Sequence, residues 1–420
     1  MIVEKRITTT TAAAAIVQPS RTRCSSREKI GALVTGADYR GLGVVRSLGR
    51  RDIPVWVLKR AAHRLAAASR YARHSTVWAE GDDSRRVEFL LELAERQGLK
   101  GWVLIPTDDD VVGLVARHHE VLSKQFCLTI PSWDNLRWGC DKRRLSKLAA
   151  ELKVDQPWTF CPANREDVER LDCKFPVIIK PAMREAFNPL TTAKAWRVDD
   201  RQSLLARYDE ARSMVSPDLI MIQELIPGWG EAQFSYAALC QDGHPLASVV
   251  ARRVRQFPMD FGQFSTFVET IEDPGVGEPA RRLLGASHYT GLVEVEFKRD
   301  SRDGRFKVLD VNPRVWGWHT LGSRVGVDFP YLLWQMIRGE TVAEIHPRTR
   351  ASWIRMNTDL PIAMLEIARR RLSAREYLRS FRRPIESAVF ATDDPLPGIL
   401  EFPTLIYLFC KRLLSRGRDA

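Results

Sequence analysis

Residues 291–319 constrain the fold of this chain more than any other stretch. They read GLVEVEFKRDSRDGRFKVLDVNPRVWGWH, in which two alternating apolar and polar runs flank a turn-forming Asp-Gly pair. Side chains alternate between the two faces of a strand, so Glu294 and Glu296 share one face of the first run. By the same rule Asp310 and Asn312 share one face of the second. The pattern predicts a β-hairpin that carries carboxylates on both strands.

The parity of the hairpin loop decides whether these carboxylates meet. An odd loop centred on Asp303 places Glu296 directly across from Asp310, whereas a two-residue loop places Glu296 opposite Val311. Directly opposed carboxylates repel by up to about 1 kcal/mol, and a cation between them offsets that cost. Oxygen ligands of this kind suit Mg²⁺ that also holds phosphate oxygens. The alternative is a polar sheet face turned to solvent.

The hairpin ends in Asn312-Pro313-Arg314. A proline directly after a strand ends the hydrogen-bond ladder. The arginine that follows can bind a phosphate or a carboxylate through two parallel hydrogen bonds. A plain turn remains the alternative explanation of this motif.

The region before residue 139 reads as a parallel α/β unit. Strand-like runs (ALVTG, IPVWVL, WVLIPT) alternate with helical patterns. The first loop holds Gly36, Gly41 and Gly43, which is not a GxGxxG motif, and no acidic residue closes the next strand at Leu58, so a nicotinamide site is weakly supported. We interpret Asp108-Asp109-Asp110 as acidic residues that cap a helix N-terminus.

From residue 139 to about 345 the strands become frequent and the connections short. Strand-like runs are FPVIIK, LIMIQEL, QFSYAALC, LASVVARRV, LVEVEFK and FKVLDVN, which indicate an antiparallel-rich α+β region. Residues 346–420 are rich in arginine and end in an apolar stretch, GILEFPTLIYLFCKRLLSRGR. This segment can lie on a membrane surface or dock its apolar side on the protein's own core. No segment reaches the roughly 20 apolar residues of a membrane span.

Composition sets broad limits. A chain of 420 residues with 45% hydrophobic content can bury more than one core. The formal charge of +12 is spread along the chain and no nucleic-acid recognition motif accompanies it, so we expect no nucleic-acid partner. The seven cysteines are scattered without a CxxC pair, which predicts a reducing cytoplasm. Residues 1–28 read as a floppy tail.

The hairpin and its Asn-Pro-Arg ending resemble the last strands of the ATP-grasp superfamily. The chain is most similar there to carboxylate-amine ligases of the D-aspartate ligase and carbamoyl-phosphate synthase-like groups. The resemblance implies an α/β plus α+β architecture, in which a Rossmann-like pre-ATP-grasp domain precedes the nucleotide-binding lobes and a basic extension follows. The expected divisions are residues 1–28, 29–138, 139–345 and 346–420.

The resemblance implies that Glu296, Asp310 and Asn312 hold magnesium, with Mn²⁺ as a substitute, and that Arg314 stabilises the transferring phosphoryl group. Asp310 stands where a Glu is more usual, and its shorter arm reduces bidentate chelation of a second metal.

Lys142 and Lys180 match the family's phosphate-binding lysines. Lys142 lies in the first turn of a predicted helix, where a cation opposes the helix dipole by roughly 0.3 to 1 kcal/mol, so a nearby anion would explain it. Lys180 ends a buried strand and needs a partner unless it reaches solvent.

LIMIQELIPGWGE resembles the hinge between the lobes. There the backbone of Glu224 and Ile226 would bind the adenine edge, and Glu231 would accept from the ribose hydroxyls; a buried strand ending at Pro227-Gly228 looks similar.

ARRVRQFP resembles the segment that brings a further cation to the phosphates. We predict that Arg253 and Arg255 share one strand face and Arg252 the other, and take Arg253 as the catalytic candidate. Lys194 is another candidate, although the loop before it lacks the glycines of many superfamily members.

The sequence thus predicts a ligase that uses ATP and Mg²⁺ to activate a small-molecule carboxylate as an acyl phosphate and joins it to an amine. Two alternatives stay open: a bicarbonate-phosphorylating enzyme with the same nucleotide site, and a nucleotide-binding scaffold without turnover. Substrate specificity is expected in the loops at 36–43 and 316–320. Peripheral membrane contact and a homodimer are compatible with the sequence.

Overall fold

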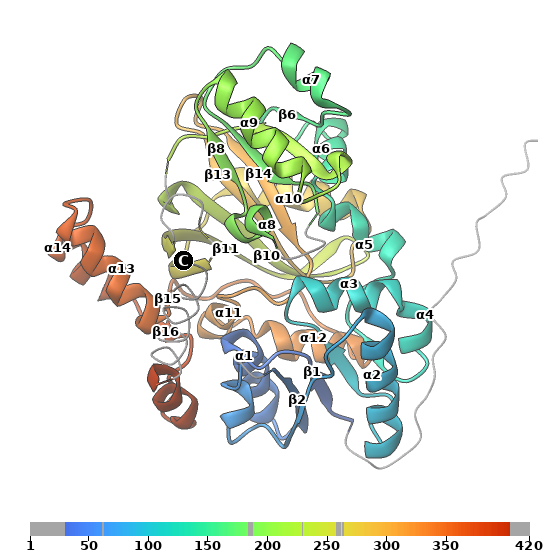
Figure 1. The fold of residues 1–420 in the computed structure, drawn as a ribbon. Coiled ribbons are helices and arrows are strands. Elements are labelled where there is room, and N and C mark those ends of the chain that lie inside the picture. Colours follow the sequence, from blue (N-terminus) through green and yellow to red (C-terminus); the bar gives the residue numbers. More distant parts are fainter. Residues whose placement is uncertain are drawn as a thin grey trace, which may run out of the picture.

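The computed structural model describes residues 30–60, 63–183, 188–228, 230–257, 262 and 264–403, whose strands form three sheets (Figure 1). The tail at 1–28, part of the loop before Lys194 and the end of the C-terminal stretch lie outside the described residues.

The first sheet is parallel throughout, with the order β3-β2-β1-β4-β5. Short apolar runs form its central strands, which are buried on both faces. The strand order reverses between β1 and β4, and ligands of open α/β sheets commonly bind beside the carboxyl ends of such neighbours. The strands and helices of this unit are β1 (Ala32–Val34), α1 (Tyr39–Gly49), β2 (Val55–Lys59), β3 (His74–Val77), α2 (Asp83–Gln97), β4 (Val103–Ile105), α3 (Asp109–Arg117), α4 (His119–Leu122) and β5 (Cys127–Leu128).

The second sheet is small and antiparallel, with the order β6-β9-β7-β8. Its core is built from apolar side chains of β7, β9 and the helices α7 and α9, including Val177, Ile222 and Leu204. The elements from the end of the first unit through this sheet are α5 (Trp133–Cys140), α6 (Lys142–Glu151), β6 (Thr159–Phe160), α7 (Arg165–Arg170), β7 (Val177–Pro181), α8 (Pro189–Ala193), β8 (Trp196–Val198), α9 (Arg201–Arg212) and β9 (Ile220–Glu224).

The third sheet has seven strands in the order β14-β13-β10-β11-β12-β15-β16 and lies between the other two units in Figure 1. Its pairings are antiparallel except for β15 with β16. Its elements are β10 (Gln233–Gln241), β11 (His244–Phe257), β12 (Phe264–Thr270), α10 (Pro274–Ala286), β13 (Gly291–Arg299), β14 (Phe306–Asn312), α11 (Thr320–Arg324), α12 (Phe329–Ile337), β15 (Ser352–Ile354), α13 (Met356–Ala368), α14 (Ala374–Arg379) and β16 (Ile385–Ser387).

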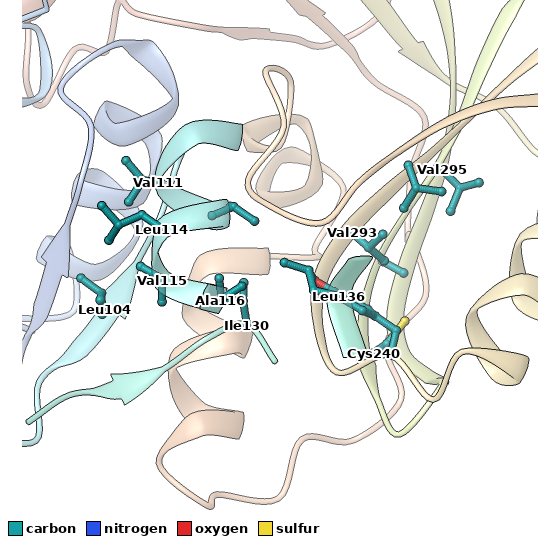
Figure 2. Packing of buried hydrophobic residues seen from close by; sticks show 14 of the residues in the cluster. Leu104, Val111, Leu114, Val115, Ala116, Ile130, Leu136, Cys240, Val293 and Val295 are labelled. Carbon is teal, nitrogen blue, oxygen red and sulfur yellow. The ribbon is translucent and has the colours of Figure 1, made fainter. Parts of the chain in front are cut away.

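The two faces of β13 have different surroundings. Val293 and Val295 belong to a buried apolar cluster that also includes Leu136 of α5 and residues of α3, and Figure 2 shows these side chains along the boundary of the parallel unit and the large sheet. Because side chains alternate, the opposite face of β13 presents Glu294 and Glu296. Packing of the apolar face therefore fixes where the carboxylates point.

The predicted hairpin register is present, but the loop parity was wrong. Glu296 pairs with Asp310, and Glu294 with Asn312. Arg299 pairs with Phe306, so the loop is residues 300–305, an even number. A β-bulge that leaves Leu309 unpaired adds one residue to β14 and restores the register.

The C-terminal region is attached to the large sheet through β15, β16 and the first turns of α13. Asp359 of α13 is fully buried and accepts hydrogen bonds from Arg255 (2.8 Å) and from the Thr266 hydroxyl (2.9 Å). Beyond this anchor, α13 extends outward at the left of Figure 1. The end of α14 returns to the sheet, where the centre of the Tyr377 ring lies 4.9 Å from the Arg255 guanidinium and Phe381 lies near Phe267. Among the described helices, none has the length and apolar character needed to cross a bilayer.

Candidate functional site

The centre of the site is the carboxylate-bearing face of the β13–β14 hairpin. The Asn312 amide Nδ2 donates to Glu294 Oε2 at 3.1 Å and to Glu296 Oε1 at 3.2 Å, so one amide holds both carboxylates. Trp318 Nε1 donates to the other Glu294 oxygen at 2.9 Å. Both oxygens of Glu294 are therefore engaged.

The two glutamates differ in their electrostatics although they lie two residues apart. Burial, together with the charge of Glu296, raises the pKa of Glu294 to about 7. Burial also acts to raise the pKa of Glu296, but the charges of Arg253 and Lys194 outweigh it and lower this pKa. Glu296 is thus the ionised member of the pair at neutral pH.

Arg253 of β11 is the cation that contacts Glu296. Its Nη2 donates to Glu296 Oε1 at 3.0 Å and its Nη1 to Gln233 Oε1 at 2.6 Å. The predicted sharing of a face with Arg255 was wrong, because a bulge between Arg253 and Arg255 turns the latter toward Asp359. Arg252 lies on the opposite face from Arg253 and pairs with Glu269.

Lys142 and Asp310 form the second charged pair of the site. Lys142 begins α6, and its Nζ lies 3.1 Å from Asp310 Oδ1, so the anion expected near this lysine is a carboxylate of the hairpin. Burial opposes the charge of Lys142, but the attraction and hydrogen bond of Asp310 outweigh it and raise the Lys142 pKa. For Lys180, at the end of β7, burial and the nearby charge of Lys142 lower the pKa to about 8.

The directly paired residues Glu296 and Asp310 each have one carboxylate oxygen that accepts no hydrogen bond from the described residues. The hydrogen bonds to Glu296 reach Oε1, and the one to Asp310 from the Val311 N–H reaches Oδ1. Lys142 Nζ also lies closest to Asp310 Oδ1. The two residues are direct partners across the strands, where Cβ atoms lie about 4.5 to 5.5 Å apart. A divalent cation between them would take the oxygens that the protein leaves unused.

The donor set fits an ion that also binds an external ligand. The described residues contain no group of three or more His, Cys, Asp or Glu side chains gathered as a self-sufficient metal site. Glu296, Asp310 and Asn312 supply two carboxylates and an amide, which suits Mg²⁺ completed by phosphate oxygens and water.

Arg314 links this face to the parallel sheet. It forms an ion pair with Asp109 at the start of α3, with Nη2 3.1 Å from Asp109 Oδ2, and it donates to Asn312 Oδ1 at 3.2 Å. Asp108 caps α3 as predicted by accepting from the Val111 N–H at 3.0 Å. Capping therefore accounts for Asp108, but not for Asp109, whose role the sequence pattern missed.

The loops predicted to hold specificity lie against each other. A Cβ atom on Gly317 would lie 2.9 Å from the Tyr39 hydroxyl, and one on Gly43 would lie 2.5 Å from His319 Nε2. The loop after β1 thus abuts the segment that follows Arg314. Both adjoin the switch point between β1 and β4, where a substrate would reach the hairpin face.

The predicted hinge residues follow β9. The Glu224 N–H donates to the Trp158 carbonyl, and its carboxylate accepts from the Trp158 N–H (3.0 Å), Lys307 (3.1 Å) and Arg302 (2.8 Å). Ile226 is buried, and its backbone makes no hydrogen bond within the described residues. Glu231 is exposed near Lys298, whose Nζ donates to the Gly228 carbonyl at 2.7 Å.

A separate cavity of about 370 Å³ lies beside β2 and β3 in the parallel unit. Its lining includes Lys59, Arg64, Trp78, Arg86 and Asp110, and none of the predicted site residues.

Comparisons with known proteins agree with this architecture. The chain is 22% identical to D-aspartate ligase of Enterococcus faecium over 252 residues, which is 54% of this chain and 57% of that protein. It is 24% identical to the C-terminal section of the carbamoyl phosphate synthase large chain of Methanopyrus kandleri over 182 residues, or 41% of this chain and 32% of that protein. The chain thus spans about half or less of these relatives. No protein-family model matches it.

Solved structures share the fold at low sequence identity. L-amino acid ligase from Bacillus licheniformis superposes with a TM-score of 0.58 at 14% identity, covering 78% of this chain and 80% of that structure. Biotin carboxylase from Campylobacter jejuni gives a TM-score of 0.59 at 15% identity, covering 74% and 72%. The shared fold extends well beyond the hairpin.

Proposed function

We propose that this chain, which has the ATP-grasp fold and resembles carboxylate-amine ligases, activates a carboxylate with ATP and joins it to an amine. The observation that carries the proposal is the pair Glu296 and Asp310, directly opposed, each with one oxygen left without a protein donor. Lys142, Arg253 and the amide of Asn312 surround this pair. A Mg²⁺ ion bound there would supply positive charge to the pair and would also bind the phosphate oxygens of the nucleotide.

Glu296, Asp310 and Asn312 would hold Mg²⁺, or Mn²⁺ in its place, and the ion would supply neutralisation of the triphosphate charge during phosphoryl transfer. For the nucleotide, the unpaired backbone of Ile226 supports adenine binding beside Glu224, and Glu231 is placed next to it for the ribose. Lys142 and Lys180 lie toward the hairpin face, where the phosphates would be.

In the first step an oxygen of the substrate carboxylate attacks the γ-phosphorus in line. The bond from that phosphorus to its bridging oxygen breaks and ADP leaves, which gives an acyl phosphate. Lys142 and Lys180 stabilise charge on the phosphate oxygens. Arg314, held by Asp109 and Asn312, is oriented to stabilise the transferring group or the acyl phosphate.

In the second step the amine nitrogen attacks the acyl carbon. The carbon–oxygen bond to the phosphate breaks, inorganic phosphate leaves, and the nitrogen loses a proton, so that an amide remains. No Ser/His/Asp arrangement is needed, because positioning and charge stabilisation carry this chemistry. Both small-molecule substrates would approach along the loops 36–43 and 316–320.

The proposal extends to the organisation of the chain. Residues 29–138 would be the Rossmann-like pre-ATP-grasp domain, 139–345 the nucleotide-binding lobes and 346–420 a basic C-terminal extension. A cytoplasmic site of action is proposed from the sequence, in which the seven cysteines are scattered without a CxxC pair. A homodimer is compatible with this organisation.

A phosphate-release screen tests the proposed activity. The full chain is incubated with Mg-ATP and pools of amino acids, polyamines or bicarbonate, and Glu296→Gln serves as the blank. We expect phosphate release that needs both a carboxylate and an amine. Release with bicarbonate alone would favour a carboxylase-like reaction, and equal release by both proteins would reject the proposed role of Glu296.

A further inference from the structure

The C-terminal region carries most of the exposed apolar surface of the molecule. Of the fourteen large apolar side chains exposed in the described part of the chain, ten lie between residues 356 and 402. Leu378 is 69% exposed and Met364 is 63% exposed. Scattered single exposed apolar residues are ordinary, but a concentration in one region marks an interaction surface.

Helix α13 shows why its exposed side needs a cover. Its inner side is already packed, because Ile362 and Ala363 are buried and Asp359 is anchored to Arg255. The outer side presents Leu360 and Met364, which are one helical turn apart. Since the inner side docks on the protein's own core, that docking leaves the outer apolar stripe unexplained.

Arginines lie next to this stripe. Residues 369–383 contain seven arginines and one acidic residue, Glu376. Three of the arginines serve the structure. The buried carboxylate of Glu366 pairs with Arg371 at 2.6 Å and with Arg369 at 3.6 Å. Arg383 pairs with Glu269 of β12 at 3.1 Å. Others are available, and Arg370, Arg375 and Arg382 make no ion pair with the described residues.

Arg370 follows the end of α13, where a positive charge complements the helix dipole. Its side chain is exposed and forms no ion pair with the described residues. The charge of Arg370 is therefore accessible to an external anion.

We infer that α13, α14 and the turn between them form a docking surface for an anionic lipid bilayer, which we call the C-terminal arm (residues 356–383). Apolar side chains flanked by arginines are what the interface of such a bilayer binds. The turn between α13 and α14 lies at the outside of the molecule in Figure 1, where a surface can reach it. The following sequence, TLIYLFCKRLLSRGR, has the same mixture of apolar and basic residues. A nucleic acid is a less suitable partner, because its phosphate backbone would bind the arginines but would not bury the exposed side chains of Met364 and Leu378.

Vesicle co-sedimentation of the full chain tests the inference. We expect binding to vesicles that contain phosphatidylserine, weakening with salt, and little binding to phosphatidylcholine alone. The combined substitution Arg370→Gln, Arg375→Gln and Arg382→Gln should weaken binding about a hundredfold, since each basic residue near an anionic membrane contributes about fivefold. Leu378→Ser, at an exposed site that folding does not require, should weaken it several-fold.

The matched control removes the same charge elsewhere. Arg85→Gln, Arg96→Gln and Lys100→Gln change exposed residues of α2 and the turn after it, and this variant should bind vesicles as the wild type does. Equal loss in both triple variants would show a net-charge effect and overturn the inference. Binding to neutral vesicles as tight as to anionic ones would also overturn it.

Two other occupants are outcomes of the same test. Self-association that Leu378→Ser abolishes, without vesicle binding, would assign the surface to a second copy. Tight binding of an RNA or DNA oligonucleotide without vesicle binding would assign it to nucleic acid. Phosphate release is measured without vesicles, so a chain that binds anionic vesicles but never turns over ATP contradicts the proposed function and leaves this inference standing.

Discussion

Two clusters of charged side chains, at the hinge and on the hairpin face, contain similar residues but are in different states. At the hinge, Glu224 and Asp300 face Arg302 and Lys307, with Lys307 Nζ 2.8 Å from Asp300 Oδ2 and Arg302 Nη2 2.8 Å from Glu224 Oε2. Hydrogen bonds from Arg302 and Lys307 lower the pKa of Asp300. For Glu224, burial acts in the opposite direction, but the bonds from Trp158, Lys307 and Arg302 outweigh it and lower the pKa.

The hairpin face is not satisfied in this way. Burial beside Glu296 raises the pKa of Glu294 to about 7, and Glu296 and Asp310 each keep an oxygen without a protein donor. In the hinge cluster the carboxylates and cations of the protein pair with one another and stabilise the fold. In the hairpin cluster the carboxylates keep oxygens that an external cation can bind. The charges of the hinge cluster are therefore structural, whereas those of the hairpin cluster are available to a ligand.

The largest expected effect follows loss of the Glu296 charge. Glu296→Gln keeps the side-chain shape and removes one of the two opposed carboxylates, so turnover should fall by about a hundredfold or more. The melting temperature should fall modestly as well, because the lowered pKa of Glu296 means that Arg253 and Lys194, against the effect of burial, stabilise this charge in the folded protein. Phosphate release under saturating Mg-ATP measures the effect. If the variant retains more than half of the wild-type rate, the hairpin carboxylate is not needed for turnover, and the proposed difference between the two clusters is wrong.

The next effect concerns the cation opposite Asp310. Lys142→Gln removes the amine 3.1 Å from Asp310 and should lower turnover by roughly 30- to 100-fold. Lys147→Gln, an exposed lysine on the same helix, is the matched control and should retain wild-type turnover. A similar loss of turnover in both variants would show that the effect comes from changing helix α6 and not from losing the ion pair between Lys142 and Asp310.

A pH effect should follow from Lys180. The pKa of Lys180 in the folded protein is about 8, below the ordinary value of 10.5. The charged amine therefore destabilises the folded state below pH 8. As the pH increases from 8 toward 10.5, this destabilisation is lost and the free energy of unfolding should rise. Phosphate binding needs the charged amine. Nucleotide affinity should therefore fall by up to about tenfold per pH unit above the pKa of the complex.

Lys180→Arg provides the control for this titration, because arginine stays charged throughout the range. Calorimetric titration of wild type and variant with a nonhydrolysable ATP analogue from pH 7 to 10 measures both slopes. Identical slopes in the two proteins would assign the pH dependence to another group.

The smallest effect on activity is expected at the hinge. Glu224→Gln breaks ion pairs to Arg302 and Lys307 but leaves both cations with Asp300, so unfolding should become easier by about 1 kcal/mol. Turnover should fall by less than about threefold, because the proposed adenine contacts are made by the backbone. Melting temperature and phosphate release are measured together. A hundredfold loss of turnover would show that the hinge carboxylate is as functional as the hairpin one.

Strand alternation was enough to predict which residues of the hairpin share a face. Glu294 and Glu296 follow from a period of two along β13, which the apolar packing of Val293 and Val295 keeps. On β14 the period holds from Asp310 to Asn312, but the bulge at Leu309 interrupts it before Asp310. Glu294 was on the predicted face, but its raised pKa depends on its depth of burial together with the charge of Glu296, and a local pattern does not encode burial depth.

Features that depend on irregular backbone were beyond the sequence pattern. A bulge separated Arg253 from Arg255, and another at Leu309 corrected an even loop. Likewise, nothing local to Asp109 indicates Arg314, because the two are 205 residues apart and meet where separate units pack together.

Manganese binding tests the central claim most directly. Paramagnetic titration of the full chain with Mn²⁺ in the presence of a nonhydrolysable ATP analogue reports the ion between the opposed strands. We expect Glu296→Gln and Asp310→Asn each to weaken Mn²⁺ binding by at least tenfold, and Glu224→Gln to leave it unchanged. Wild-type Mn²⁺ affinity in both hairpin variants would contradict the account.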